Sequence, residues 1–155
     1  MPEKVKPIPD GYHTFTPYLI IKGAANAIDF YKKAFGATEL FRIPGSNGRI
    51  GHAEIKIGDS PIMLADEHPE IGALSPDTVG GCPVHLMLYV EDVDTTFNQA
   101  VAAGGQVKDP LTNKFYGDRM GAIRDPFGFL WYLATHIEDV SPEDMQARAA
   151  AEQHG

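Results

Sequence analysis

The alternation of apolar and polar positions predicts two amphipathic helices in matching places along the chain. Residues 24–35 and 93–103 each carry apolar side chains at helical spacing. Gly36 and Gly104 follow these runs, and glycine is the residue that most often ends a helix. Asp92 precedes the second run and suits an N-cap. The chain therefore contains two helices of similar length, one in each half.

Strand-like segments surround both helices, and their order repeats. Aligning Ile21 with Val90 gives an offset of 69 residues (90 − 21 = 69), and the same offset pairs Gly36 with Gly105. Each half then reads strand, helix, strand, strand, strand. The predicted strands are residues 14–21, 37–43, 48–58 and 60–66 in the first half, and 84–90, 105–109, 118–124 and 129–135 in the second.

Turn and linker residues divide this pattern into modules. Residues 45–48, 58–61 and 125–128 are rich in Gly, Pro, Ser or Asp and predict tight reversals. The polar, Pro- and Gly-rich stretch 67–83 predicts a linker, and Ser141 followed by Pro142 predicts the start of a C-terminal helix. We expect a single domain over residues 1–155, with module one at about 12–66, module two at about 84–136 and the C-terminal helix at about 141–152.

Composition narrows the class of protein. The chain has 155 residues, of which 43% are hydrophobic and 22% charged, as expected for one globular unit. A formal net charge of −8 disfavours nucleic acid and anionic membranes as partners, because a polyanion attracts basic surfaces. The lone Cys82 has no partner for an internal disulfide. No apolar run is typical of a membrane span or a secretory signal, so we expect a cytoplasmic protein.

Four motifs add a resemblance to this pattern. The segments "IDFYKKAFGA", "YVEDVD", "FYGDR" and "DPFG" resemble the vicinal oxygen chelate superfamily of glyoxalase I, extradiol dioxygenases and bleomycin-resistance proteins, and most of all its PhnB-like branch. The resemblance covers residues 12–136. It implies an α+β fold in which two βαβββ modules form a curved mixed sheet around a cavity. It also implies a homodimer and, in metal-dependent members, four side chains that chelate a divalent cation.

The motif places the four chelating positions on the first and last strands of each module. They correspond to Thr16, Met63, His85 and Tyr132. A hydroxyl, a thioether, one imidazole and a phenol are not the nitrogen and carboxylate donors that such a cation needs. We therefore predict neither metal nor other cofactor. A divalent ion on a rearranged set that includes His52, Glu54 and His85 remains the alternative, opposed by Lys56 on the same strand face as His52 and Glu54.

Strand alternation also predicts which side chains line the cavity. Tyrosines and methionines are frequent among them, as in small-molecule pockets. A solvated or dimer-covered sheet face is the alternative. Within residues 113–121, aromatic side chains could stack on a ligand while Arg119 pairs with its carboxylate or phosphate, or Asp118 and Arg119 could order the turn. The predicted ligand-binding residues are Thr16, Tyr18, His52, Glu54, Met63, His85, Met87, Tyr89, Tyr116, Arg119 and Tyr132.

Three functions fit these observations. The first is a metal-free, homodimeric small-molecule-binding protein of the bleomycin-resistance type. The second is an enzyme, a lyase, isomerase or dioxygenase-like protein with a rearranged metal site or an acid/base pair, for which Glu54 and His85 are the catalytic candidates. The third is an interaction protein whose sheet face is covered by a partner. Neither the ligand nor the way the modules pair follows from the sequence.

Overall fold

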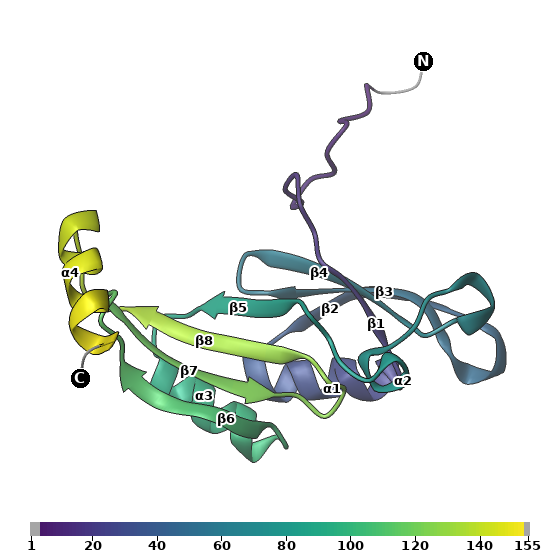
Figure 1. Cartoon of the computed structure of the whole chain (residues 1–155). Helices are drawn as coiled ribbons and strands as arrows, with labels where there is room; N and C mark the ends of the chain where they lie inside the picture. The colour runs from purple at the N-terminus through teal and green to yellow at the C-terminus, as the bar shows by residue number, and fades with distance from the viewer. Residues whose placement is uncertain (1–3, 154–155) are drawn as a thin grey trace. The chain divides into compact units, whose positions relative to one another are not determined.

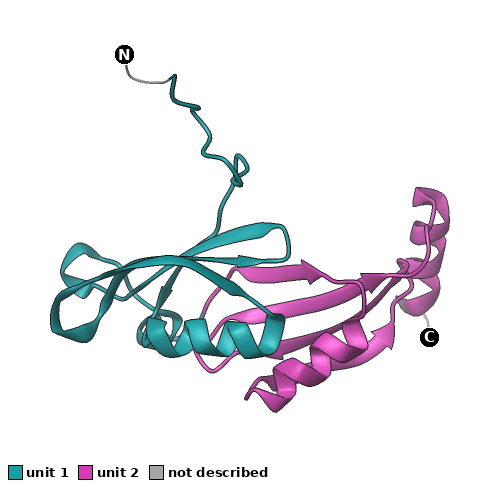
Figure 2. Ribbon diagram, turned by 180° about the vertical axis from the view of Figure 1, so that it is seen from behind, with its two compact units in different colours: residues 1–81 teal, residues 82–155 magenta. Residues whose placement is uncertain are grey.

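The computed structural model describes residues 4–153, and the chain divides into two compact units, residues 1–81 and 82–155 (Figures 1 and 2). The boundary falls inside the predicted linker. Each unit contains one copy of the predicted module, so the strand-helix-three-strand layout is confirmed. None of the helices in residues 4–153 is long and apolar enough to cross a membrane.

Unit one is a four-stranded mixed sheet with one long helix against it (Figure 1). The strand order is β1-β4-β3-β2, and only the β1–β4 pair is parallel. A 3₁₀ turn joins β2 to β3, and two short helical turns follow β4. The elements are β1 (Tyr18–Ile21), α1 (Ala24–Phe35), β2 (Thr38–Pro44), η1 (Ser46–Gly48), β3 (Ile50–Ile57), β4 (Ser60–Asp66), η2 (Pro69–Ile71) and α2 (Pro76–Val79).

Unit two repeats this arrangement and adds the C-terminal helix. Its strand order is β5-β8-β7-β6, with β5 and β8 parallel. Ser141 caps the last helix as predicted, because its Oγ accepts the backbone N–H of Asp144 at 3.1 Å. The elements are β5 (His85–Tyr89), α3 (Val93–Ala102), β6 (Gln106–Asn113), β7 (Asp118–Arg124), β8 (Leu130–His136) and α4 (Pro142–Gln153).

The core of unit one lies between α1 and the sheet. Ile28 and Tyr31 of α1 and Ile55 of β3 are fully buried, as the helical and strand periodicities predict. The helix begins at the end of β4, where Asp66 Oδ1 accepts the backbone N–H groups of Gly23 and Ala24 at 3.0 and 2.9 Å. This carboxylate satisfies amides that have no partner within the helix, and it fixes α1 on the sheet.

The core of unit two lies between α3 and β6, β7 and β8. Phe97 of α3 packs over Gly121 of β7, where an added Cβ would lie 2.7 Å from the phenyl ring. Trp131 and Leu133 of β8 are buried on the same side of the sheet. Figure 2 shows α1 and α3 each running along one face of the sheet in its own unit. The opposite face of each sheet is therefore the one left for function.

The register of the strands confirms the 69-residue repeat. In unit one, Tyr18 of β1 lies beside Met63 of β4. In unit two, Met87 of β5 lies beside Tyr132 of β8, and both members of this pair are 69 residues further on (87 − 18 = 132 − 63 = 69). The 69-residue alignment of the two halves is therefore confirmed at these strands.

Two predicted features of the strands are wrong. The first strand begins at Tyr18 and not at residue 14, so Thr16 lies outside it and is half-buried. Arg119 was predicted to face a ligand, but it lies on the helix side of β7, because Gly121, two residues further on, faces α3. Apolar residues occupy both faces of β7, and the alternation therefore did not distinguish them. Asp118, Met120 and Ala122 take the face opposite α3.

Candidate functional site

The exposed face of the unit-one sheet brings three predicted site residues side by side. Tyr18, Met63 and Glu54 lie at neighbouring positions on β1, β4 and β3. Their side chains share the face opposite α1, because Leu19, Leu64 and Ile55, which follow them in the alternation, are buried. Three strands of one rigid sheet therefore position a phenol, a thioether and a carboxylate together.

A line of short hydrogen bonds joins Tyr18 to Glu54 through His52. Tyr18 Oη lies 2.7 Å from His52 Nδ1, and His52 Nε2 lies 2.7 Å from Glu54 Oε2. His52 and Glu54 are two residues apart on β3, so their side chains project from the same face. The ring of Phe41 lies 5.9 Å from the imidazole, centroid to centroid. Both nitrogens of His52 are therefore engaged.

Burial sets the acidity of the groups at the two ends of this line. Glu54 is only 8% exposed, and burial raises the pKa of its carboxyl. Burial also raises the pKa of the Tyr18 phenol, which stays a proton donor at neutral pH. Within residues 4–153, Glu54 forms its salt bridge with His52 and none with Lys56. A proton can pass along this line, because the imidazole can accept at one nitrogen while it donates at the other.

A cavity of about 430 Å³ lies beside Tyr18 within unit one. Of the predicted ligand-binding residues, Tyr18 lies in its wall, whereas the neighbouring Glu54 and Met63 do not. The rest of the wall comes from β1, the start of β3, the end of β4, the β2–β3 turn and the linker, and the prediction had included neither the turn nor the linker. The lining residues are Tyr18, Ile20, Gly45, Ser46, Arg49, Ile50, Gly51, Ala65, Asp66, Glu67, His68, Ile71 and Ala73.

The corresponding face of unit two carries His85, Met87 and Tyr132. The imidazole of His85 lies 5.5 Å from the ring of Tyr132, centroid to centroid. No hydrogen bond or ion pair of the His85 side chain occurs within the described part of the chain. Met87 is 41% exposed beside Tyr132. Unit two therefore presents an aromatic and thioether surface here, and the ligand-binding role of these residues stays a prediction.

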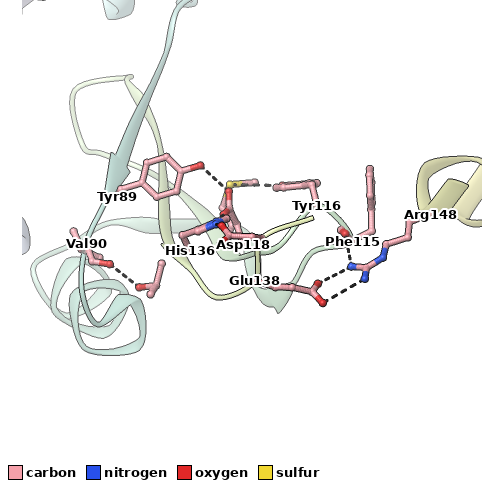
Figure 3. A network of polar contacts seen from close by, with 11 residues as sticks. Tyr89, Val90, Phe115, Tyr116, Asp118, His136, Glu138 and Arg148 are labelled. Carbon is pink, nitrogen blue, oxygen red and sulfur yellow. Dashed lines mark hydrogen bonds and ion pairs between the residues drawn. The ribbon is translucent and has the colours of Figure 1, made fainter. Parts of the chain in front are cut away.

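A second polar network lies at the far ends of β5 and β8 (Figure 3). Asp118 accepts the Tyr89 hydroxyl at 2.7 Å through one carboxylate oxygen, and the other lies 2.8 Å from His136 Nδ1. His136 Nε2 lies 2.7 Å from the fully exposed Asp139. The hydrogen bond to Asp118 is the largest cause of the raised pKa of the Tyr89 phenol. The hydrogen bond between Asp118 and His136 is likewise the largest cause of the raised pKa of the His136 imidazole. His136 is exposed at the end of β8, and its two hydrogen bonds tie it into this network.

The segment between β6 and β7 differs from its prediction in one respect. Arg119 binds Asp94 of α3 in a bidentate ion pair, with both nitrogen–oxygen distances 2.9 Å, so it lies on the helix side of the sheet and pairs with neither Asp118 nor the opposite face. Tyr116 is half-buried and lies 3.7 Å from the sulfur of Met120. Arg148 of α4 donates to the carbonyl of Phe115 at 3.0 Å and binds Glu138 (Figure 3). Contacts with α3, α4 and β7 therefore hold this segment in place.

The donors at the four chelating positions do not fit the divalent cation of the metal-dependent family members. Met63 and Tyr132 stand at matching places in the repeat, and a thioether and a phenol are not the carboxylate donors that such a cation prefers. Thr16 lies outside β1. Among residues 4–153, no group of three or more His, Cys, Asp or Glu side chains is arranged to hold a metal ion. The rearranged set of His52, Glu54 and His85 does not form such a group.

Known proteins share this fold. A solved structure, TioX from Micromonospora sp. ML1, is 26% identical to this chain, with a TM-score of 0.64 over 81% of this chain and 99% of TioX. A PhnB protein from Bacillus cereus matches 79% of this chain and 99% of its own, with a TM-score of 0.61. At 20% identity this likeness shows a common fold.

Sequence comparison establishes the family. Uncharacterized protein Mb0911c from Mycobacterium bovis is 39% identical over 143 residues, which are 90% of this chain and 94% of that protein. The family model described as the Glyoxalase/Bleomycin resistance protein/Dioxygenase superfamily matches residues 12–133. This superfamily is the one that the four sequence motifs resemble. The chain belongs to the glyoxalase, bleomycin-resistance and dioxygenase superfamily.

Proposed function

We propose that the protein binds a small molecule without a metal ion and without chemical change. The cavity of unit one is the observation that carries this proposal, because its volume of about 430 Å³ lies within the range of small-molecule sites. Ile20, Ile50 and Ile71 supply apolar contact, while the Tyr18 hydroxyl can orient a polar group. The exposed Met87 and the half-buried Tyr132 beside it offer a second apolar surface in unit two.

A substitution that fills the cavity tests this proposal. Ala73 lies on the wall, in the linker after η2, so Ala73→Trp should fill the cavity without changing the sheet. A ligand that binds only the folded state raises the melting temperature. We expect compounds from a neutral, anionic and cationic panel to stabilise the wild type and to lose that effect in Ala73→Trp. Ala102→Trp, on the exposed surface of α3, is the matched control and should keep it.

The homodimer expected from the family resemblance is part of the same proposal. Leu40, Phe41 and Ile43 are about half exposed on β2, which is an edge strand of the unit-one sheet. An exposed apolar edge strand favours association. Light scattering during size-exclusion chromatography should give twice the mass of the chain, and a monomeric mass would contradict the dimer without affecting the binding proposal.

One observation favours an enzyme as the second candidate. The line Tyr18–His52–Glu54 combines a buried carboxyl of raised pKa with a phenol that reaches the cavity. Tyr18 Oη could take an α-proton from a bound substrate while its own proton passes to His52 Nδ1 and the Nε2 proton of His52 passes to the Glu54 carboxylate. The reverse movement returns a proton to the substrate. This arrangement favours Glu54 and His52 over the predicted pair of Glu54 and His85.

Proton exchange distinguishes the enzyme from the binding protein. A panel of small carbonyl compounds in D₂O should show protein-dependent loss of α-proton signals in NMR spectra if the line acts as an acid/base catalyst. Glu54→Gln should abolish the exchange, since an amide cannot carry the proton. Lys56→Gln changes a residue on the same strand face and should retain it. No exchange with any compound would leave the binding function alone.

A further inference from the structure

The cavity of unit one contains four titratable or charged side chains besides Tyr18, and they differ in what they already bind. Arg49 comes from the β2–β3 turn, whereas Asp66, Glu67 and His68 come from the end of β4 and the linker. In Figure 1 this turn and the linker lie at the same end of unit one. The charge of a ligand that fits this cavity depends on which of these four side chains is available to bind it.

Both carboxylates are occupied by donors of the chain itself. Asp66 accepts Gly23 and Ala24 through one oxygen and the backbone N–H of Ile50 through the other, at 2.7 Å. Glu67 accepts the Thr78 hydroxyl at 2.7 and 2.9 Å, which lowers the pKa of this carboxyl. These two groups fasten α1, β3 and the linker to β4. Their main role is structural.

The third lining group is less available than its position suggests. His68 Nε2 lies 3.2 Å from Glu70, and its backbone N–H and carbonyl are bonded to Ala73. The imidazole therefore already has an acidic neighbour within η2. A ligand would have to compete with Glu70 for it.

Arg49 is the lining cation without an ion pair among the described residues. Its backbone is nevertheless fixed. Its carbonyl accepts Gly45 N–H at 2.7 Å, its own N–H donates to Ser46, and the next residue, Ile50, is bonded to Asp66. The turn thus holds the base of the side chain in place and leaves the guanidinium unengaged. A planar guanidinium binds carboxylates and phosphates through two parallel hydrogen bonds.

We infer that the unit-one cavity binds a small organic carboxylate, whose charged group pairs with Arg49 and whose apolar body lies against Ile20, Ile50 and Ile71. This inference rests on the proposed binding function and names the ligand's class. A singly charged carboxylate is preferred to a doubly charged phosphate, because Asp66 and Glu67 already place two negative charges in the same wall. The guanidinium of Arg49 can compensate one negative charge on the ligand, and Asp66 and Glu67 would repel a second negative charge.

Three probes with the same aromatic body test the inference by isothermal titration calorimetry. They are 2-naphthoate, its neutral analogue 2-naphthamide, and 2-naphthyl phosphate. The wild type should bind 2-naphthoate more tightly than the other two. Arg49→Gln should weaken 2-naphthoate about tenfold, which is the size of one charge-assisted contact, and should leave 2-naphthamide unchanged. Arg124→Gln removes the same charge from the exposed end of β7 and should leave all three affinities unchanged.

The outcomes separate this inference from the function on which it rests. Equal binding of 2-naphthoate and 2-naphthamide by the wild type, or an unchanged 2-naphthoate affinity in Arg49→Gln, would overturn the carboxylate assignment while small-molecule binding stands. Stronger binding of 2-naphthyl phosphate would overturn the preference for a single charge. If none of the three probes binds, the inference is wrong, and the compound panel with Ala73→Trp then decides the proposed function by itself.

Discussion

Each unit contains a tyrosine, a histidine and an acid joined on the sheet face opposite its helix, but the order differs. In unit one His52 is the central member, between Tyr18 and the buried Glu54. In unit two the buried Asp118 is central, between Tyr89 and His136 (Figure 3). The same three kinds of side chain thus form two networks with different chemical capacities.

The central residue decides what each network can do. An imidazole can accept a proton on one nitrogen and donate one from the other, so the unit-one line can carry a proton between its ends. An ionised carboxylate only accepts hydrogen bonds, so Asp118 holds Tyr89 and His136 in place without linking them for proton transfer. The unit-one line therefore suits chemistry at the cavity, and the unit-two network suits stability.

The largest expected effect on stability comes from removing Asp118, the central residue of the unit-two network. Asp118→Ala should reduce the free energy of unfolding by about 2–4 kcal/mol, because it removes two hydrogen bonds to a buried carboxylate. Trp131 is the one tryptophan of the sequence and is buried in unit two, so its fluorescence during urea unfolding reports on this unit.

Asp139→Ala is the matched control for this change. Asp139 contacts the other nitrogen of His136 but is fully exposed, so its loss should leave urea unfolding nearly unchanged, within about 0.5 kcal/mol. Equal losses in Asp118→Ala and Asp139→Ala would show that the burial of Asp118 contributes nothing, and the contrast between the two networks would fail.

A smaller effect of opposite sign is expected in unit one. Burial raises the folded-state pKa of Glu54 above its ordinary value of 4.5, so the folded state binds the proton more tightly than the unfolded state. Stability then falls as the pH rises from about 4.5 through the folded pKa. Glu54→Gln should remove this fall and stabilise the protein at pH 7 by about 1 kcal/mol or less.

Hydrogen exchange of the β3 amides at pH 5 and pH 7 measures this effect within unit one. The wild type should lose protection between the two values, whereas Glu54→Gln should not. Lys56→Gln, on the same face of β3, should follow the wild type. A clear loss of protection in Glu54→Gln at pH 7 would mean that Glu54 stabilises its unit as Asp118 does, and the two networks would then be alike.

Periodicity in the sequence predicts most of the fold, because it reflects burial directly. The residues of α1 and the 69-residue repeat follow from which side chains are apolar, and the structure agrees with both. The same rule fails on β7, where Gly121 and Ala122 are both small and buried. On β7 the contact between Gly121 and Phe97 of α3 determines which face of the strand is covered. The residue pattern of the strand alone gives no information about this contact.

The candidate site is predictable only as far as it lies within one strand. His52 and Glu54 were placed together because residues two apart on a strand share a face. Their link to Tyr18 depends on the order β1-β4-β3, which brings residues 34 positions apart into contact. The Arg49 wall of the cavity depends on how the β2–β3 turn meets the linker. Contacts between distant segments follow from the topology and not from local spacing.

The smallest expected effect is confined to a pH window in unit two. The hydrogen bond to Asp118, followed by that to Asp139, raises the folded-state pKa of His136 above 6.5. The stability that this protonated imidazole contributes is complete below about pH 6.5 and is lost as the pH rises through the folded pKa. Urea unfolding followed by Trp131 fluorescence should therefore show a decline above pH 6.5 in the wild type and in the control His13→Gln, and none in His136→Gln. Identical pH profiles for all three proteins would show that His136 does not hold its proton against Asp118, and the unit-two network would then lack its charged donor.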